Sequence, residues 1–348
     1  MVSLSMSLRI EVNAEAFNAV ETVGNLTKHR RAPMIIPTES GYRLIYVPAV
    51  SGESIANAYQ RNLVEATKII YQSNPPLTQW DLRYEFSKFM DNSHLTPNLL
   101  KIVQSKPKDI TSAKHEFEKI AIRESIVADI GGFLYAEEAF PVKRTSRFYS
   151  GYMLPTYDSI EATAIEAQFH ARHMPAEAGA GGQRAAQMIY YVEIASALYG
   201  VTIMLDIDGI GRTSLVKIED AVDPGERANR VKAALAALQG LFLGVGFGAK
   251  LSRFMPVKRI VSAVAVVTSP IAIVASPAQV PTYIEDTESK ILKLASTSES
   301  LGINTKYEII AYGGRPKDNK TKRASTAEEF FEFVIDSVLR FSGIRKSL

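Results

Sequence analysis

The sequence predicts an α+β fold for a chain of 348 residues. Apolar and polar residues alternate from 4 to 12, which is typical of a strand with one buried face. The stretch 223–240 is typical of a helix, with Asp223 as N-cap, Pro224 in the first turn and Gly240 at the end. Strands and helices follow in mixed order without regular βα repeats, which disfavours a doubly wound parallel sheet.

The other elements of the N-terminal two thirds follow from the same signals. We expect a loop at 24–31 and a short strand at 44–47. A helix is then expected from its N-cap Ser51 to about Gln72. Apolar residues recur at helical spacing in 78–128, with breaks near Pro97 and Pro107, which predicts an inserted helical subdomain. Residues 189–206 predict strands broken at Gly200.

The C-terminal third predicts a strand pair at 260–275, a helix at 285–300, a strand at 306–312 and a last helix at 326–341. Thr326 and Glu329 have the spacing of a capping box at the start of that last helix. The uncharged run 260–284 resembles a membrane span, but its three prolines and its β-branched residues favour buried strands. We therefore expect no contact with a membrane.

The composition is that of a globular protein, with 46% hydrophobic and 22% charged residues. Because the chain has no cysteine, disulfides, thiolate metal sites and cysteine nucleophiles are excluded, and an intracellular protein is favoured. The N-terminus lacks a basic region followed by an unbroken apolar stretch, so no signal peptide is expected. These features predict a cytoplasmic protein.

Positive charge is segregated along the chain, although the net charge is only +3. The windows 22–38, 139–157 and 227–284 contain three, three and seven Lys/Arg residues and no Asp or Glu. Cations without competing carboxylates are what a phosphate-rich ligand requires, so these windows predict a polyanion site. The alternative for part of the longest window is a buried strand pair, which would lack acids because charged residues are rarely buried.

Two of these windows repeat the tripeptide Ser-Arg-Phe, at 146–148 and 252–254. The first lies in VKRTSRFYSGYMLP, where cations mix with Phe148, Tyr149 and Tyr152 in a way that suits single-stranded nucleic acid. The rings can equally be core positions. The second follows a glycine-rich stretch, 240–248, that matches neither nucleotide-binding glycine motif. Its glycines permit close approach of backbone N–H groups to an anion, and the alternative is a flexible connection.

Three histidines are candidates for acid–base chemistry or metal binding. His29 lies in the cationic stretch KHRR and could transfer a proton on RNA, but one histidine supplies half of what an RNase needs. His170 and His173 could share a helix face with Glu166, but their spacing is not that of the HEXXH zinc motif. We interpret these two histidines as contacts in a protruding segment.

Asp206 and Asp208 could together hold Mg²⁺, although such a pair is more typical of an acidic turn.

Several motifs resemble, in order along nearly the whole chain, those of one family. It is the major backbone subunit of archaeal type I CRISPR surveillance complexes (Cascade), or DevR-type CRISPR-associated autoregulators, within the RAMP superfamily. The matching stretches are TVGN followed by KHRR, PAVSGESIANAYQ, GGFLYAEEAFPVKRTSRFYSGYMLP, FHARH, VEIASALYG and GAKLSRFMP. The ordered set is specific, although no single motif is.

The resemblance implies a modified RNA-recognition-motif (ferredoxin-like) core at 1–50 and 130–348, with a helical insertion at 51–129 and a thumb-like hairpin at 158–187. It further implies copies that stack along a CRISPR RNA and hold its backbone, so that the bases remain free to pair with target DNA. Such a chain would have as partners the CRISPR RNA, target DNA, further copies of itself and other Cascade subunits. It would act in antiviral interference without catalysis and without a cofactor or metal.

The resemblance also implies which residues contact RNA. A helix N-terminus suits a phosphate, which gives the start at Ser51 a physical reason as well. The two Ser-Arg-Phe stretches would form two walls of one phosphate-tracking groove. The alternative function is a metal-independent RAMP endoribonuclease that processes precursor CRISPR RNA with His29 or His170. The implied contact residues are Lys28, His29, Arg30, Arg31, Ser51, Gly52, Ser54, Lys143, Arg144, Arg147, His170, His173, Gly246, Gly248, Lys250 and Arg253.

Overall fold

The computed structural model describes residues 1–105, 107–172, 188–248, 251–314 and 320–344. Its main sheet has ten strands in the order β14-β13-β12-β1-β11-β3-β2, with β8, β9 and β10 also paired to β11. The strands are β1 (Ser3–Glu15), β2 (Ala19–Val23), β3 (Leu26–His29), β8 (Phe148–Ser150), β9 (Leu154–Pro155), β10 (Ala164–Arg172), β11 (Met188–Asp206), β12 (Val257–Ser269), β13 (Lys306–Tyr312) and β14 (Lys322–Ala324). Strands and helices are mixed, as an α+β protein requires.

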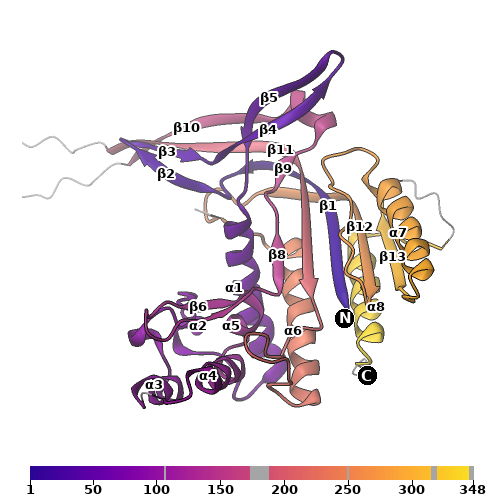
Figure 1. Cartoon of the computed structure of the whole chain (residues 1–348). Helices are drawn as coiled ribbons and strands as arrows, with labels where there is room; N and C mark the ends of the chain where they lie inside the picture. Colours follow the sequence, from indigo (N-terminus) through magenta and orange to yellow (C-terminus); the bar gives the residue numbers. More distant parts are fainter. Residues whose placement is uncertain (106, 173–187, 249–250, 315–319, 345–348) are drawn as a thin grey trace, which may run out of the picture.

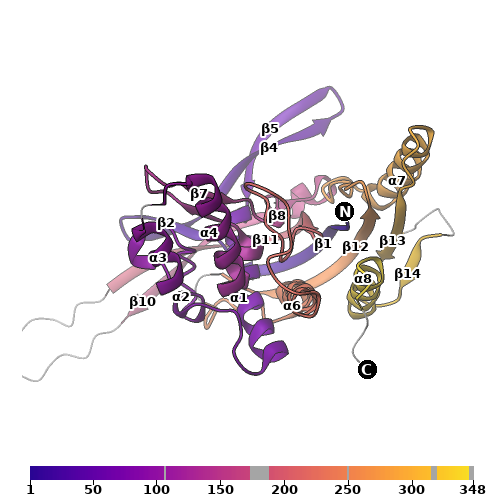
Figure 2. The same cartoon turned by 60° about the horizontal axis from the view of Figure 1, so that its bottom comes forward.

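Two smaller sheets lie outside the main one. Strands β4 (Arg31–Thr38) and β5 (Gly41–Pro48) form a hairpin that projects from the body in both views (Figure 1, Figure 2). Strands β6 (Phe133–Tyr135) and β7 (Val142–Arg144) form a short pair beside the small helices.

Four strands and two helices form the centre of the molecule. The chain runs from β1 through α1 (Gly52–Tyr71) to β8 and β11, and then through α6 (Pro224–Leu243) to β12. In the sheet these strands lie in the order β12, β1, β11, β8, and each neighbouring pair is antiparallel. Helices α1 and α6 contact each other along their length and pack, with α8 (Ala327–Phe341), on one face of the sheet (Figure 1).

The predicted alternation in β1 is confirmed, because Leu4, Met6 and Leu8 are buried in the main core. The opposite face of β1 carries small hydroxyl side chains, which are buried as well. Ser5 Oγ donates to the carbonyl of Ile203 at 3.2 Å and accepts from the N–H of Ala275 at 3.0 Å. Small polar residues therefore allow the segment 270–282 to cover this face of the sheet.

The expected helical insertion forms a second core of its own. Its elements are α2 (Gln79–Leu82), the 3₁₀ helix Asn92–His94, α3 (Pro97–Gln104), α4 (Ile110–Glu124) and α5 (Ile126–Gly131). Phe89, Phe117 and Phe133 pack together in this core. Helix α1, which we expected to open the insertion, instead buries its apolar face in the main core.

Two glycines that we interpreted as breaks lie inside regular elements. Strand β11 continues through Gly200, where a Cβ would lie 2.9 Å from the backbone of Ala278. Helix α6 continues past Gly240, where a Cβ would lie 2.5 Å from Oδ1 of Asn62 on α1. Gly200 is required because backbone approaches it closely, whereas a Cβ at Gly240 would meet only the side chain of Asn62, and neither glycine ends its element.

Other expectations need correction at the level of elements. Residues 24–31 are mostly strand, because β2 and β3 form a hairpin and β4 begins at Arg31. The pair expected at 260–275 is the single strand β12, followed by irregular chain and α7 (Tyr283–Ser300). After the 3₁₀ helix Tyr157–Ala162, the segment with His170 is strand β10, paired with β11, and not a helix. No helix in the described ranges is long and apolar enough to cross a membrane.

Candidate functional site

The N-terminus of α1 is held in place by polar contacts from the chain that follows β1. Ser51 is the N-cap, as predicted, and its Oγ accepts from the N–H of Ser54 at 3.3 Å. Asn18 Oδ1 accepts from the N–H of Ser51 at 2.8 Å and from the hydroxyl of Ser54 at 3.1 Å. The N–H groups of Gly52 and Glu53 have no intrahelical partner and can bind an anion, and the carboxylate of Glu53 lies in the same first turn.

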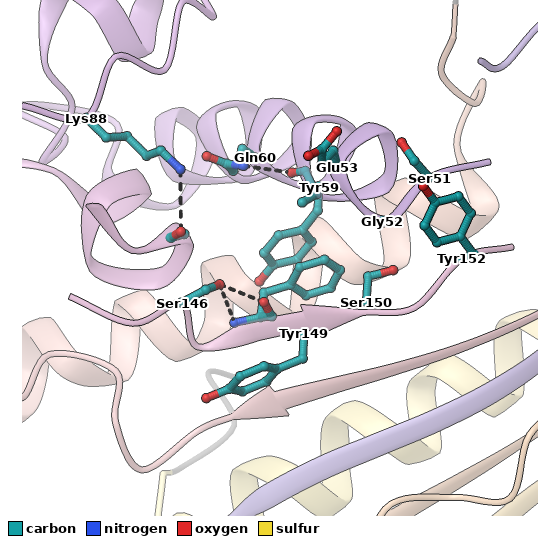
Figure 3. Close-up of a pocket in the computed structure, with 13 residues that line it drawn as sticks. Ser51, Gly52, Glu53, Tyr59, Gln60, Lys88, Ser146, Tyr149, Ser150 and Tyr152 are labelled. Carbon is teal, nitrogen blue, oxygen red and sulfur yellow. Dashed lines mark hydrogen bonds between the residues drawn. The ribbon is translucent and has the colours of Figure 1, made fainter. Parts of the chain in front are cut away.

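Two hollows flank this helix start. The larger, which we call the α1 hollow, has a volume of about 490 Å³ and is shown in Figure 3. Strand β8 forms its other wall, and a Cβ on Gly52 would lie only 2.6 Å from the carbonyl oxygen of Ser150. Its lining residues are Ser51, Gly52, Glu53, Ala56, Tyr59, Gln60, Lys88, Gly131, Ser146, Phe148, Tyr149, Ser150 and Tyr152.

The smaller hollow, of about 250 Å³, joins the helix start to the glycine-rich loop. Ser54 and Arg61 line it from α1, and Gly248 lines it from the loop. The rings of Phe17 and Phe247 stack at 4.6 Å, and Gly248 has a φ of +113°, with a hypothetical Cβ 2.6 Å from Cα of Phe17. The structure therefore brings two predicted contact regions together, although they are far apart in sequence.

The same loop contains a second conformationally special glycine beside a cation. Gly246 has a φ of +102°, and a Cβ there would lie 3.9 Å from Nζ of Lys258. That ammonium donates to the carbonyl of Phe242 at 3.0 Å. Burial lowers the pKa of Lys258 to about 8.

The second Ser-Arg-Phe stretch contacts the β10–β11 hairpin. Arg253 donates a hydrogen bond to the hydroxyl of Tyr190, and its guanidinium lies 5.9 Å from the centre of that ring. His170 stacks on Tyr190 at 5.1 Å and lies 5.6 Å from the ring of Phe254. Among the described residues His170 Nε2 is buried without a hydrogen-bond partner. His173 and Lys250, which belong to the predicted set, lie outside the described residues.

Arg144 does not face any groove, so its predicted role as an RNA contact is corrected. Its side chain is fully buried and forms ion pairs with Glu118 at 3.0 Å and Asp129 at 2.5 Å. Asp129 also pairs with the buried Arg230 of α6 at 2.9 Å. These ion pairs connect the helical insertion to the main core.

Arg147 and Arg253 do not form two walls of one groove. Arg147 pairs with Asp206 at 3.1 Å, and its side chain is 11% exposed. Their partners, Asp206 for Arg147 and Tyr190 for Arg253, lie near opposite ends of β11, a separation of roughly 50 Å along an extended strand.

Phe148 is buried and stacks on the core ring of Tyr59, so the core interpretation holds for that ring. The pairing of Asp206 with an arginine also fits the acidic-turn interpretation.

His29 is buried as well and has both ring nitrogens occupied. Nε2 contacts Glu15 at 2.8 Å, and Nδ1 contacts the carbonyl of Arg30 at 2.8 Å. The same Glu15 oxygen accepts from the hydroxyl of Tyr199 at 2.8 Å. Burial alone would lower the pKa of His29, but the hydrogen bond and charge of Glu15 outweigh it and raise the pKa. In this arrangement the side chain does not reach an RNA ligand.

The remaining predicted cations are more accessible. Lys28 is exposed on β3, and Lys143 is exposed on β7, beside the helical insertion. Arg31 is half-exposed and pairs with Glu193 at 3.2 Å. Arg30 is half-buried; its backbone N–H donates to the carbonyl of Asn18 at 3.0 Å, and its Nε is buried without a hydrogen-bond partner among the described residues.

A model of one protein family matches residues 6–288, described as "CRISPR-associated negative auto-regulator DevR/Csa2". The chain belongs to the DevR/Csa2 family. The "CRISPR-associated aCascade subunit Cas7/Csa2 2" of Saccharolobus solfataricus is 40% identical over 296 residues, covering 83% of this chain and 87% of that protein. The "CRISPR-associated protein Cas7/Cst2/DevR" of Methanocaldococcus jannaschii is 27% identical over 344 residues, covering 96% and 99%. The family expected from the ordered motifs is therefore confirmed.

One similar solved structure is a chain of a "CRISPR RNA-guided surveillance complex, pre-nicking", with a TM-score of 0.47 and 9% identity. The overlap covers 97% of this chain and 100% of that one.

Sequence reasoning missed two residues of the site in this DevR/Csa2 chain. Asn18 positions the helix start, but an isolated asparagine gives no signal when its partner Ser51 lies far along the chain. Lys88 lines the α1 hollow from the helical insertion, where a lysine at helical spacing looks like any solvated residue. Tyr149 and Tyr152, left open as ring candidates, each keep 43% of their surface exposed at the hollow.

Proposed function

We propose that this chain is a CRISPR RNA-binding scaffold subunit of an antiviral interference complex. Copies would assemble along the guide RNA, together with other subunits of the complex, and hold the RNA by its backbone. Family membership supports this proposal, as does the 40% identity to a relative named as an aCascade subunit. The structural observation that carries it is the start of α1, where Asn18 holds a helix N-terminus between two hollows.

The central topology supports an RNA-recognition-like core. The order β12, β1, β11, β8, with α1 and α6 as the two crossovers, corresponds to a βαββαβ arrangement with an antiparallel sheet. The β10–β11 hairpin would be the thumb-like element. On this interpretation the proposed RNA path crosses the start of α1 and continues towards that hairpin.

The chemistry of the helix start suits recognition that is independent of base sequence. Backbone N–H groups and guanidinium groups bind phosphate oxygens and carry no information about base identity. A scaffold that serves many guides needs this property, because base pairing with target DNA then provides the sequence specificity. Arg61 lines the smaller hollow beside this helix start, and the backbone of Arg30 is bonded to Asn18.

The proposed contact set is smaller than the one expected from the sequence. We leave out Arg144, Arg147 and His29, because each is engaged with acidic partners inside the protein. The proposed contacts are Lys28, Arg30, Arg31, Ser51, Gly52, Ser54, Lys143, His170, His173, Gly246, Gly248, Lys250 and Arg253.

We also propose that the subunit does not cleave RNA. The nuclease alternative used His29 or His170 for proton transfer, and His29 is buried with both nitrogens bonded. Transfer of a proton requires hydrogen-bond reach to the RNA, which the His29 side chain lacks. His170 alone supplies one of the two proton-transfer groups that RNA cleavage needs.

The test is to mix the purified protein with a long, unrelated single-stranded RNA and to measure complex mass and RNA length together. We expect intact RNA that carries several copies of the protein. Shortened RNA would overturn the non-enzymatic assignment, and a protein that remains free of RNA would overturn the scaffold proposal.

A further inference from the structure

The α1 hollow extends well beyond the helix N-terminus. Ser51 and Gln60 both line it, and they are separated by about 13 Å along the helix axis. Lys88 from the helical insertion lies at the far end (Figure 3), where it donates to the carbonyl of Gly131 at the end of α5. The space is therefore longer than one phosphate requires, and its two ends carry different groups.

The ammonium group of Lys88 is poorly compensated at this far end. Its one hydrogen bond among the described residues is to the carbonyl of Gly131, at 3.4 Å, and the one acidic charge that acts on its pKa is that of Asp81. Asp81 already accepts from the N–H of Thr78 and the hydroxyl of Ser125, both at 2.8 Å. Burial lowers the pKa of Lys88, and the charge of Asp81 offsets this only in part. A partly buried cation with three donors and one weak acceptor is suited to an incoming anion.

The backbone holds Lys88 at this position despite strain. Its φ is +45°, and Phe86 and Phe89 have φ values of +46° and +61°. Left-handed conformations are unfavourable for these residue types, so they persist only where the surrounding structure enforces them. Phe89 is 1% exposed in the core of the helical insertion, and this burial anchors the segment.

A second polar atom beside Lys88 lacks a partner. Gln60 is 7% exposed; its Nε2 donates to the carbonyl of Ala56 at 3.0 Å, whereas Oε1 is buried without a hydrogen bond in the part of the chain described. In Figure 3 the Gln60 side chain lies between the helix start and Lys88. A ribose hydroxyl next to a phosphate would supply a donor at this end of the hollow, as RNA does and DNA does not.

We propose that the Lys88 end of the α1 hollow is a second phosphodiester subsite, through which the helical insertion holds the same RNA strand that crosses the start of α1. This inference rests on the proposed function. The volume of about 490 Å³ lies in the range of ligand pockets, and Tyr149 and Tyr152 also line it.

The test compares Lys88→Met with the wild type on a single-stranded RNA and a single-stranded DNA of the same sequence, over a range of salt concentrations. For RNA, we expect the affinity of Lys88→Met to fall about three- to tenfold and its salt slope to decrease by about 0.7, the value for one lost phosphate contact. Lys88→Arg should retain the slope. The control Lys293→Met, on the exposed face of α7, should match the wild type.

A stability measurement separates this role from a structural one. Without RNA, Lys88→Met should melt at the same temperature as the wild type or higher, because a desolvated charge is removed. A lower melting temperature of Lys88→Met with unchanged RNA affinity would overturn the proposal. A variant that binds DNA more weakly than the wild type but RNA equally well would overturn it too. If the wild type itself fails to bind RNA, the proposed function falls together with this inference. If the wild type binds and Lys88→Met binds equally well, only the inference falls.

Discussion

Asn18 and Ser51 are joined by a hydrogen bond of 2.8 Å from the N–H of the N-cap to the asparagine Oδ1. Asn18 is 2% exposed and follows β1, so the helix start is fixed directly to the end of a central strand. The anion-binding end of α1 therefore has a defined position relative to the sheet.

Asn18→Ala should lower the free energy of unfolding by about 1–3 kcal/mol, because a buried N–H then loses its acceptor. RNA affinity should fall as well, since the helix start is no longer held in place. Chemical denaturation and RNA titration measure the two effects. The exposed Asn13→Ala is the control, and equal behaviour of both variants would contradict the positioning role.

Gly52→Ala should destabilise the protein by about 1–3 kcal/mol, because the new Cβ overpacks the contact between α1 and β8. That Cβ would lie 2.6 Å from the carbonyl oxygen of Ser150. Gly151→Ala is a matched control, since its Cβ would meet only Thr202 O, at 3.8 Å. Thermal melting of both variants checks the prediction, which fails if the two melt together.

Arg144→Met should cost about 3–5 kcal/mol of stability, because Glu118 and Asp129 are left buried with an uncompensated charge. RNA affinity, measured on the folded protein well below its melting temperature, should be unchanged. Lys143→Met, one residue earlier on the exposed face of β7, should have the stability of the wild type. A stable Arg144→Met variant with weakened RNA binding would return Arg144 to the contact set.

Arg253→Glu should weaken RNA binding about tenfold whatever the RNA sequence, and flatten its salt dependence. Stability should change little, because Arg253 is exposed and its partner is the hydroxyl of Tyr190. Lys293→Glu, on the exposed face of α7, serves as the charge-reversal control. Filter binding at several salt concentrations measures the slopes, and identical slopes for the two variants would remove Arg253 from the interface.

The buried pair of His29 and Glu15 should make stability depend on pH. The pKa of His29 is raised above its usual 6.5, so the folded state holds this proton more tightly than the unfolded state does. The resulting stabilisation is complete below pH 6.5 and is lost as the pH rises through the raised pKa. The difference in unfolding free energy between the wild type and His29→Gln should therefore shrink from pH 6.5 upward. Denaturation at a series of pH values measures it, and Glu15→Gln should remove the trend.

The elements that the sequence predicted well are those with local causes. The alternation in β1, the N-cap Ser51 and the start of α8 at Thr326 each depend on residues a few positions apart. The family could also be predicted, because ordered motifs along a chain are a property of the sequence itself. Strand β13 was also predicted at its observed bounds, because its pattern of β-forming residues is local.

Contacts between distant segments decided the rest. Arg144 and Arg147 lie in a window without acids, so the sequence presents both as free cations. The fold supplies their acids from elsewhere in the chain, from Glu118, Asp129 and Asp206. Ion pairing depends on distance in space, and a sequence window contains no information on that distance. Only the tertiary structure could therefore separate the cations that stabilise the core from those left for a ligand.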